Sequence, residues 1–401
     1  MDGIRVAHVT TVDLTLRFLL LAQLRRLRDE GYDVVAISAP GPWVGDLRTE
    51  GIRHIAWRHA TRAWDPFADA LALAELVRIF RRERFDLVHT HNPKPGILGR
   101  IGARLAGVPF VVNTVHGFYA TPDDPPSKRL PVMALEWLAA RFSDLELYQS
   151  AEDLGWARRW RFTSRAKSVL LGNGTDLARF DPVTTSDEQI AQARRTLGVR
   201  EGELVVGTVG RMVREKGYRE FFAAARRVRQ MLPHVRFVAV GGRDPDKRDA
   251  IRQEELAGAR DDVVFVEWRT DIPLLLASMD IFVLASWREG LPRSAIEAAA
   301  MGKAMVLTDI RGCREVARHG VEGILVPPRD AERLSQAILA LARDPELRRR
   351  LGKAARSRAL ERFDELQVTD NVVARYRDLL TPEALGNGRG AFLRRAGSER
   401  A

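Results

Sequence analysis

The chain has 401 residues, of which 45% are hydrophobic and 29% are charged. This composition is typical of a globular protein, and at about 150 residues per domain the length predicts two domains. The single cysteine, Cys313, excludes an internal disulfide and therefore a disulfide-stapled secreted scaffold. No apolar run approaches the roughly 20 residues of a membrane-spanning helix, and Asp2, Arg5 and His8 interrupt the start where a signal peptide would be apolar. We therefore expect a cytoplasmic protein, soluble or peripheral on the inner face of the cell membrane.

The charge balance is positive, with 64 Lys and Arg against 53 Asp and Glu and a net charge of +11. Such a balance fits either a solvated, arginine-rich surface or attraction to an anionic partner such as nucleic acid, anionic lipid or a phosphorylated metabolite. The sequence has no zinc-finger or helix-turn-helix signature and no basic strand interleaved with aromatic residues, so nucleic acid is not expected. Trp156, Trp160 and Phe162 lie among arginines, which fits either a membrane-facing surface or an ordinary amphipathic helix.

In the first half of the chain, short apolar runs alternate with longer amphipathic segments. The runs are rich in Val and Ile, as strands buried on both faces are. They lie at 4–9, 33–38, 53–57, 86–90, 109–115 and 145–149, with helical patterns at 16–30, 66–84 and 95–105. This alternation is typical of βαβ units around a parallel sheet.

The pattern restarts after a Gly-rich and polar stretch that begins at Gly172. Strands are predicted at 204–209, 235–241, 263–266, 281–285, 304–308 and 323–326, and helices at 216–231, within 246–259, at 271–277 and from 292 onward. The fold class is therefore α/β, with two doubly wound parallel sheets in series and a ligand cleft expected at the carboxyl ends of their strands.

This pattern also predicts the domain organisation. We expect a first domain at 1–185 and a second at 195–362. The helix predicted at 366–380 should fold back onto the first domain, and 382–401, which lacks periodicity, should be a mobile tail.

The segment 286–297, Ser-Trp-Arg-Glu-Gly-Leu-Pro-Arg-Ser-Ala-Ile-Glu, joins a predicted strand to a predicted helix. Gly290 lets the backbone approach a ligand, and free N–H groups at a helix start favour anions or sugar oxygens. Because a carboxylate accepts hydrogen bonds from vicinal hydroxyls, Glu297 suits a ribose and Glu289 a hexose. The alternative is that both are ordinary acids near a helix N-terminus.

The segment 207–217, Gly-Thr-Val-Gly-Arg-Met-Val-Arg-Glu-Lys-Gly, also joins the end of a predicted strand to the start of a predicted helix. Arg211 offers a planar fork for phosphate oxygens, and Lys216 a point charge. Together with a helix N-terminus they could neutralise a departing diphosphate without a metal ion. The alternative is a surface ion pair between Arg211 and Glu215.

These motifs resemble those of the GT-B glycosyltransferases of family 4, which are retaining and nucleotide-sugar-dependent. The similarity runs from about residue 4 to 380. It is carried by Gly210-Arg211 with Lys216, the E-x7-E pair Glu289 and Glu297, and the segments 308–312 (Thr-Asp-Ile-Arg-Gly), 323–328 (Gly-Ile-Leu-Val-Pro-Pro), 89–96 (His-Thr-His-Asn-Pro-Lys-Pro-Gly), 114–118 (Thr-Val-His-Gly-Phe) and 172–176 (Gly-Asn-Gly-Thr-Asp). The first-half segments are similar to those of bacterial polysaccharide glycosyltransferases. Thr10 to Asp13 stand where many members carry a Gly-Gly pair, so this loop is not assigned to the donor.

The resemblance implies roles for individual residues. It implies that the donor is held by Arg211 and Lys216 on the diphosphate, Glu297 on the ribose, Glu289 on the sugar, and backbone groups around Gly290 and Leu291. It also implies that His116 faces the donor sugar and the acceptor. His91 and Lys94 are expected to bind the acceptor, Lys94 through a phosphate.

His89, His91 and His116 also allow a different interpretation. Three histidines at neighbouring strand ends could bind zinc in a metal-dependent hydrolase. The competing interpretation is that His89 is packed and that only His91 and His116 line the cleft; it is favoured because no carboxylate stands nearby at metal-ligand spacing.

The resemblance, together with these residues, implies a retaining, metal-independent hexosyltransferase without a cofactor. Its donor is expected to be a nucleoside-diphosphate-sugar, with UDP suggested by the polysaccharide enzymes, and its acceptor a saccharide or polyprenyl-diphosphate-saccharide. His116, Glu289, Arg211 and Lys216 are the predicted catalytic residues, and an anionic membrane surface is a further predicted partner. A zinc hydrolase, a sugar-nucleotide epimerase on the same fold and a non-catalytic binding protein remain as alternatives.

Overall fold

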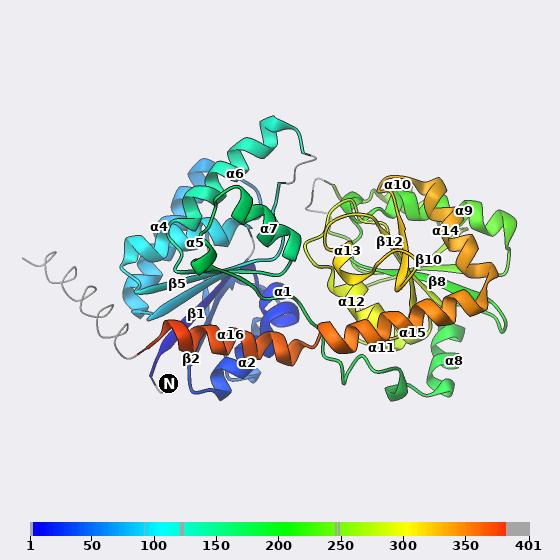
Figure 1. Cartoon of the computed structure of the whole chain (residues 1–401), viewed down its shortest axis with the longest axis horizontal. Coiled ribbons are helices and arrows are strands. Elements are labelled where there is room, and N and C mark those ends of the chain that lie inside the picture. Colours follow the sequence, from blue (N-terminus) through cyan, green and yellow to red (C-terminus); the bar gives the residue numbers. More distant parts are fainter. Residues whose placement is uncertain (1–2, 92, 121–123, 245–246, 248, 382–401) are drawn as a thin grey trace, which may run out of the picture. The chain divides into compact units, whose positions relative to one another are not determined.

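The computed structural model describes residues 3–91, 93–120, 124–244, 247 and 249–381. The chain divides into two compact units, whose described parts are residues 3–172 with 366–381 and residues 173–365. Each is an α/β unit around a parallel sheet (Figure 1), so the predicted fold class is confirmed. The segment 382–401, for which a mobile tail is predicted, lies outside the described residues.

The described part of the first unit contains a seven-stranded parallel sheet in the order β3-β2-β1-β4-β5-β6-β7. The strands are β1 (Arg5–Val12), β2 (Asp33–Ala39), β3 (Arg53–Ala56), β4 (Leu87–His91), β5 (Phe110–Val115), β6 (Leu145–Tyr148) and β7 (Ser168–Leu170). The strand order reverses between β1 and β4, which is the switch point where ligands bind in open α/β sheets.

Helices cover both faces of this sheet. They are α1 (Asp13–Thr15), a π-helical turn (Leu16–Leu20), α2 (Leu21–Asp29), α3 (Val44–Thr49), α4 (Pro66–Glu83), α5 (Pro93–Ala106), α6 (Pro126–Ala140) and α7 (Ala151–Arg159). Helix α4 begins where the Asp65 carboxylate accepts the Ala68 N–H and Pro66 occupies the first turn. Helices α4 and α5 bury their apolar sides on one face of the sheet.

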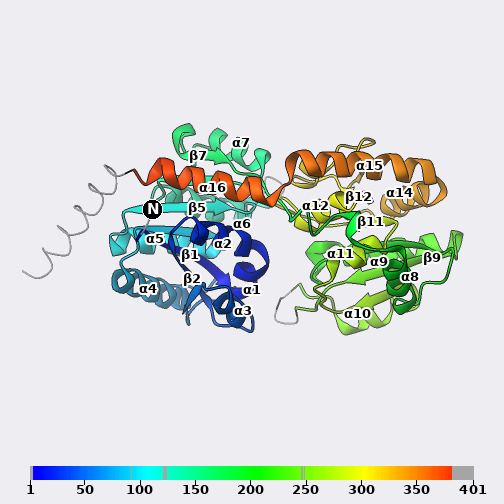
Figure 2. The same cartoon turned by 90° about the horizontal axis from the view of Figure 1, so that it is seen from below.

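The C-terminal helix α16 (Glu365–Leu379) belongs to the first unit from Leu366 onward. Val372, Val373 and Tyr376 are buried in one apolar cluster with residues of α2 and of the sheet. Figures 1 and 2 show α16, in red, beside α2. The last helix thus covers the sheet face opposite α4 and α5.

The described part of the second unit contains a six-stranded parallel sheet in the order β10-β9-β8-β11-β12-β13. Its strands are β8 (Leu204–Val209), β9 (Val235–Val240), β10 (Val263–Val266), β11 (Ile281–Leu284), β12 (Ala304–Thr308) and β13 (Gly323–Val326). Its helices are α8 (Asp187–Thr196), α9 (Tyr218–Met231), α10 (Gln253–Ala257), α11 (Ile272–Ala277), α12 (Arg293–Ala300), α13 (Cys313–Val316), α14 (Ala331–Arg343) and α15 (Pro345–Arg362). Here the strand order reverses between β8 and β11.

Two boundaries differ from the sequence-based expectation. The units divide after Gly172 rather than at 185, because Phe180, Leu197 and Val199 are buried in the core of the second unit. The helix expected from Lys216 begins at Tyr218, after a 3-10 turn (Arg214–Lys216), because Gly217 has a φ of +72° and ends that turn. Among the described residues, no helix has both the length and the apolar character needed to cross a bilayer.

Candidate active site

The predicted donor residues lie in loops at the carboxyl ends of neighbouring strands in the second unit. Arg211 and Lys216 follow β8, and Glu289 follows β11, on either side of the switch point. The Lys216 ammonium donates to Glu289 Oε1 at 2.6 Å, and the Ser286 hydroxyl donates to the same oxygen at 2.7 Å. The structure therefore brings Lys216 and Glu289, 73 residues apart, into direct contact.

The loop that carries Lys216 is tied to the loop that carries Glu289 by backbone contacts as well. The Trp287 N–H donates to the Glu215 carbonyl at 2.8 Å. A Cβ on Gly217 would lie 1.9 Å from the Ala285 carbonyl oxygen, so only glycine allows this approach. Ser286 is itself held by the Thr308 hydroxyl, which donates to its carbonyl at 2.6 Å. The positions of Lys216 and Glu289 are therefore set by packing against β11 and β12.

Arg211 lies in a group of cations around one carboxylate. Glu215 is 3.3 Å from Arg288 and 3.4 Å from Lys247, and Arg211 is 3.9 Å away. Burial, the largest single influence, raises the pKa of Glu215, but Lys247, Arg288, Lys216 and Arg211 together bring the pKa below its ordinary value. These cations would stabilise an anion placed among them for the same reason.

Arg211 also donates to Asp244 at 3.1 Å. Both predicted phosphate ligands thus have carboxylate partners here, Arg211 through Asp244 and Lys216 through Glu289. A diphosphate that binds them must replace carboxylate contacts with contacts to phosphate oxygens, which present the same bidentate geometry to an arginine.

Glu297 lies within α12 and is held by an arginine on the preceding turn. Arg293 donates to Glu297 at 3.2 Å and to Glu365 at 3.1 Å. Burial raises the pKa of Glu297, and Arg293 opposes this only in part. A partly buried carboxylate with a bound guanidinium can accept a further pair of hydrogen bonds from vicinal hydroxyls.

The backbone expected to contact the donor sugar, at Gly290 and Leu291, is also held in place. The Asn173 amide donates to the Leu291 carbonyl at 3.0 Å. A Cβ on Gly312 would lie 2.0 Å from the Gly290 carbonyl oxygen. Asn173, from the sequence motif at 172–176, therefore supports this loop within the second unit.

In the first unit, the predicted acceptor residues occupy β4 and the start of α5. His91 is fully buried, and its two ring nitrogens lie 3.0 Å from His8 Nδ1 and 3.1 Å from His116 Nε2. Both nitrogens of His91 are therefore engaged by other imidazoles. His116, which follows β5, is half-buried and reaches solvent.

Lys94 is 5% exposed, and its ammonium group contacts three acceptors: the Asp69 carboxylate, the Thr61 hydroxyl at 2.6 Å and the Ala63 carbonyl at 2.5 Å. An ammonium group has three donors. A contact between Lys94 and an acceptor phosphate would therefore require one of these bonds to break.

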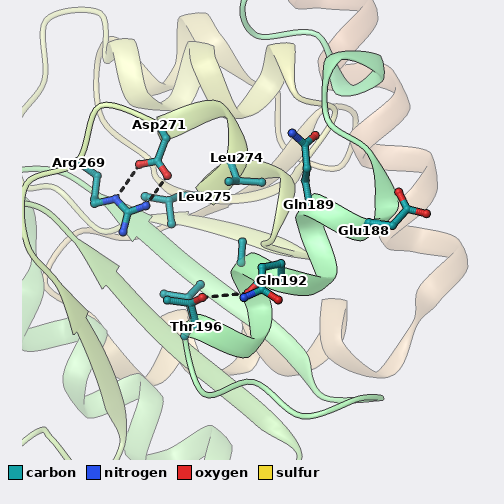
Figure 3. A pocket seen from close by; sticks show the side chains of 10 residues that line it. Glu188, Gln189, Gln192, Thr196, Arg269, Asp271, Leu274 and Leu275 are labelled. Atoms are coloured by element: carbon teal, nitrogen blue, oxygen red, sulfur yellow. Dashed lines mark hydrogen bonds and ion pairs between the residues drawn. The ribbon is translucent and has the colours of Figure 1, made fainter.

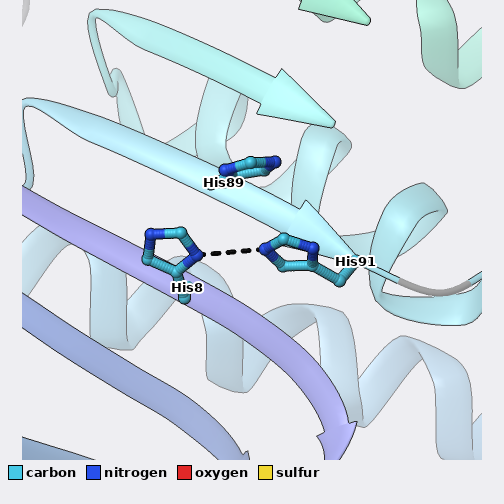
Figure 4. A group of neighbouring side chains, drawn as sticks. All are labelled: His8, His89 and His91. Atoms are coloured by element: carbon cyan, nitrogen blue, oxygen red, sulfur yellow. Dashed lines mark hydrogen bonds between the residues drawn. The ribbon is translucent and has the colours of Figure 1, made fainter. Parts of the chain in front are cut away.

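The three histidines considered for zinc do not form one cluster. His89 pairs with Tyr376 and with Thr114, each at 2.7 Å, which occupies both of its ring nitrogens. The imidazoles that do approach one another are His8, His89 and His91, whose ligand nitrogens lie within 4.8 Å (Figure 4). The sequence-based set of three histidines does not include His8.

A separate pocket lies between α8 and the segment that leads into α11 (Figure 3). It has a volume of about 350 Å³ and is lined by Gln189, Gln192 and Leu274 among others. Its Arg269 is paired in bidentate fashion with Asp271, at 2.8 and 2.5 Å. None of the predicted donor residues lines this pocket.

Sequence reasoning missed the residues that hold the predicted ones. Ser286, Arg293 and Asn173 stand within the quoted segments but had no role assigned to them. These roles, and that of Asp244, follow from contacts in the fold. Arg293 could have been found, because it stands four residues before Glu297 in a predicted helix.

Two doubly wound parallel sheets in one chain are the architecture of GT-B enzymes. Structures with this fold include HepE from Anabaena in complex with UDP and glucose, with a TM-score of 0.76 and 20% identity over 94% of this chain and 100% of that one. Sucrose-phosphate synthase from Thermosynechococcus elongatus has a TM-score of 0.79 and 23% identity, covering 94% of this chain and 99% of that one. These likenesses establish the fold of a GT-B glycosyltransferase.

The sequence places the chain more closely. Residues 189–358 match the family described as glycosyl transferases group 1, and residues 5–145 match the family described as glycosyl transferase 4-like. The chain belongs to the GT-B glycosyltransferases of family 4.

Two relatives match nearly end to end. The UDP-Gal:alpha-D-GlcNAc-diphosphoundecaprenol alpha-1,3-galactosyltransferase of Escherichia coli is 27% identical over 94% of this chain and 97% of its own length. The N,N'-diacetylbacillosaminyl-diphospho-undecaprenol alpha-1,3-N-acetylgalactosaminyltransferase of Campylobacter jejuni is 26% identical over 88% and 91%. The comparisons confirm a glycosyltransferase and support neither the hydrolase nor the epimerase.

Proposed function

We propose that this glycosyltransferase moves a sugar from a UDP-sugar to a hydroxyl of a polyprenyl-diphosphate-linked saccharide in cell-surface polysaccharide synthesis. Two relatives that match most of the chain are named for transfer to undecaprenyl-diphosphate-linked sugars. The observation that carries the proposal is the pairing of Lys216 with Glu289 at the switch point, with Arg211 on the same loop as Lys216. This arrangement offers cations to a diphosphate and a carboxylate to a sugar within one loop cluster.

The reaction we infer proceeds with retention and without a metal ion. The bond between the anomeric carbon and the β-phosphate oxygen breaks, and the acceptor oxygen bonds to the same face of that carbon. The acceptor hydroxyl proton passes to the departing phosphate oxygen. Lys216 and Arg211 stabilise the negative charge on the diphosphate, the task that a divalent cation performs elsewhere.

Glu289 and Lys216 act as a pair in this scheme. When Lys216 turns to a phosphate oxygen, Glu289 keeps the Ser286 hydroxyl and gains room to accept hydrogen bonds from sugar hydroxyls. Glu297, oriented by Arg293, binds the ribose. Backbone groups at Gly290 and Leu291 complete the donor contacts, and His116 contacts the donor sugar and acceptor from the first unit.

We further propose that the first unit docks on anionic lipid through α6. Leu130, Leu135, Trp137 and Leu138 on this helix are 40–59% exposed. Arg141 lies over the Trp137 ring at 4.2 Å, so the apolar side chains are bordered by a cation, as at a membrane interface. The stretch around Trp156 is less suited, because Trp156 and Phe162 pack against Phe118 and each other.

Nucleotide binding tests the donor site. UDP, GDP, ADP and CDP are compared by thermal shift in the presence of a chelator, and we expect UDP to give the largest rise in melting temperature. In the native protein, 2′-deoxy-UDP should bind about tenfold more weakly than UDP, because it lacks a hydroxyl contact with Glu297 worth about 1.4 kcal/mol. In the Glu297→Gln variant this contact is lost for UDP as well, so the two nucleotides should bind with equal affinity. Binding that depends on added metal, or equal shifts from all four nucleotides, would contradict the assignment.

Turnover is tested with UDP-galactose and other UDP-sugars on an undecaprenyl-diphosphate-linked sugar. The product's anomeric configuration, read by NMR coupling constants, should match that of the donor. An inverted product would overturn the retaining mechanism while leaving the donor site intact.

A further inference from the structure

One face of the first sheet changes from apolar to polar as its strands approach their carboxyl ends. Alternate residues of a strand point to the same face, and the face covered by α16 carries Val6, Leu87, Val112 and Leu147 in its apolar cluster. The residues two or four positions further along are polar: His8 on β1, His89 and His91 on β4, Thr114 and His116 at the end of β5, and Gln149 after β6.

The side chains of this row form a continuous chain of hydrogen-bond contacts. His89 Nε2 lies 2.7 Å from the Thr114 hydroxyl, and His89 Nδ1 lies 2.7 Å from the Tyr376 hydroxyl. The Tyr376 hydroxyl lies 3.4 Å from His8 Nε2.

From His8 the chain continues toward the switch point. His8 Nδ1 lies 3.0 Å from His91 Nε2, as Figure 4 shows, and His91 Nδ1 lies 3.1 Å from His116 Nε2. The imidazoles of His8, His89 and His91 in this row of hydrogen bonds are fully buried, whereas His116, at its end, is half-buried. His116 also has a side-chain hydrogen bond with Gln149.

The imidazoles of the chain are neutral at pH 7. Burial lowers the pKa of His8 to about 3 and that of His116 to about 4, and it places the pKa of His89 and His91 well below 6.5. Burial likewise raises the pKa of Tyr376 well above its ordinary value, so its hydroxyl keeps its proton.

A neutral imidazole has one N–H donor and one acceptor nitrogen. When both nitrogens of a ring are engaged, the direction of one hydrogen bond determines the direction of the next. The two links that join His8, His91 and His116 therefore run in the same direction. If the Tyr376 hydroxyl donates to His8 Nε2, then His8 Nδ1–H donates to His91 and His91 Nδ1–H donates to His116 Nε2. If the hydroxyl instead accepts from His8, both links reverse, so the tautomer of His116 is coupled to the orientation of the Tyr376 hydroxyl.

We propose that Tyr376, His8 and His91 are positioning residues that, with His89 and Thr114, hold His116 in a single tautomer and ring orientation for its contact with the substrate. The proposal rests on the proposed function, because that function places His116 against the donor sugar and acceptor. It gives α16 a role in the site of the first unit beyond covering the sheet. It also accounts for burying so many polar rings, since a buried ring nitrogen without a hydrogen bond destabilises the fold.

The test is Tyr376→Phe, with Tyr32→Phe as the matched control. The Tyr32 ring packs edge-on against Tyr376 with centroids 5.8 Å apart, and its buried hydroxyl lacks a hydrogen-bond partner among the described residues. Each substitution removes one buried hydroxyl from the same cluster. We expect Tyr376→Phe to lower kcat about tenfold, equivalent to about 1.4 kcal/mol, with the UDP-induced thermal shift unchanged, and Tyr32→Phe to leave kcat unchanged.

A double-mutant cycle separates positioning from general damage to the unit. If Tyr376 acts through His116, Tyr376→Phe has little further effect on kcat once His116→Asn is present. A second tenfold loss in that background would overturn the proposal.

Nitrogen-15 spectra of labelled histidine test the chain without turnover. In the native protein, each of the four imidazoles should show one protonated and one unprotonated nitrogen. Tyr376→Phe should move the two His116 shifts toward each other, as tautomers average, and Tyr32→Phe should not. Unchanged His116 shifts in Tyr376→Phe, or one equivalent of zinc bound by His8, His89 and His91 in elemental analysis, would overturn the proposal.

These readouts keep the two proposals distinguishable. Absence of UDP release with every UDP-sugar tried would contradict the proposed function, while the imidazole spectra would still decide whether the hydrogen-bond network holds His116. Normal turnover in the native protein with equal kcat in Tyr376→Phe and Tyr32→Phe would contradict only the proposed role of that network.

Discussion

The two units share a topology but place opposite kinds of side chain at their switch points. In the second unit the side chains are charged and form ion pairs between loops, Lys216 with Glu289 and Arg211 with Asp244. In the first unit, His8 and His91 are neutral, buried and hydrogen-bonded to other rings. A site with charged groups suits a diphosphate whose charge grows during reaction, whereas a neutral hydrogen-bonded network suits the orientation of hydroxyl groups.

The largest effect is expected where charge develops. Lys216→Ala should lower kcat about 10²- to 10³-fold, the range seen when one charge-stabilising donor is removed, with a smaller loss of UDP affinity. Turnover of the UDP-sugar and UDP binding are measured separately. Arg226→Ala, on α9 with an exposed ion pair to Asp262, is the control and should be neutral. Equal loss in both variants would mean that the charged switch point has no special role.

The neutral switch point should reveal itself in the pH dependence of stability. The folded-state pKa values of His8 and His116, about 3 and 4, lie below the unfolded value of 6.5. Their contribution to the free energy of unfolding is therefore fully present above pH 6.5. It is lost as the pH falls toward 4, because the unfolded chain takes up protons that the folded chain does not. Each such imidazole contributes a slope of up to about 1.4 kcal/mol per pH unit in the free energy of unfolding.

Buried carboxyls with raised pKa values, such as Glu297, act in the opposite direction, so the slope is compared between variants. His8→Asn should remove about one histidine's share of the slope between pH 6.5 and 5 in urea unfolding. Tyr32→Phe, which removes neither an imidazole nor a carboxyl, is the control and should leave the slope unchanged. A slope in His8→Asn equal to that in Tyr32→Phe would show that His8 takes up its proton in the folded protein as it does in the unfolded chain.

The sequence was sufficient for the architecture, because strand and helix patterns are local. The alternation of apolar runs predicted both sheets, and the resemblance carried by E-x7-E and Lys216 implied that both loops contact one donor. Contact partners were harder to predict, since Lys216 and Glu289 are 73 residues apart and His89 and Tyr376 are 287 apart. His8 was within reach, however, because it follows Val6 at the spacing of one sheet face, as His89 follows Leu87.

The comparison also predicts where the first unit uses positive charge. The switch point of the first unit is neutral, and in our proposal the cation that faces the membrane is Arg141 on α6. The attraction between Arg141 and anionic lipid should be screened by salt. Arg141→Gln should weaken binding to phosphatidylglycerol vesicles about fivefold, or about 1 kcal/mol, and should not alter binding to neutral phosphatidylcholine vesicles. Sedimentation with vesicles measures both, and Arg226→Gln in the second unit is the control. A similar loss in the two variants would mean that net charge, rather than α6, drives attachment, and the α6 surface would then need another partner.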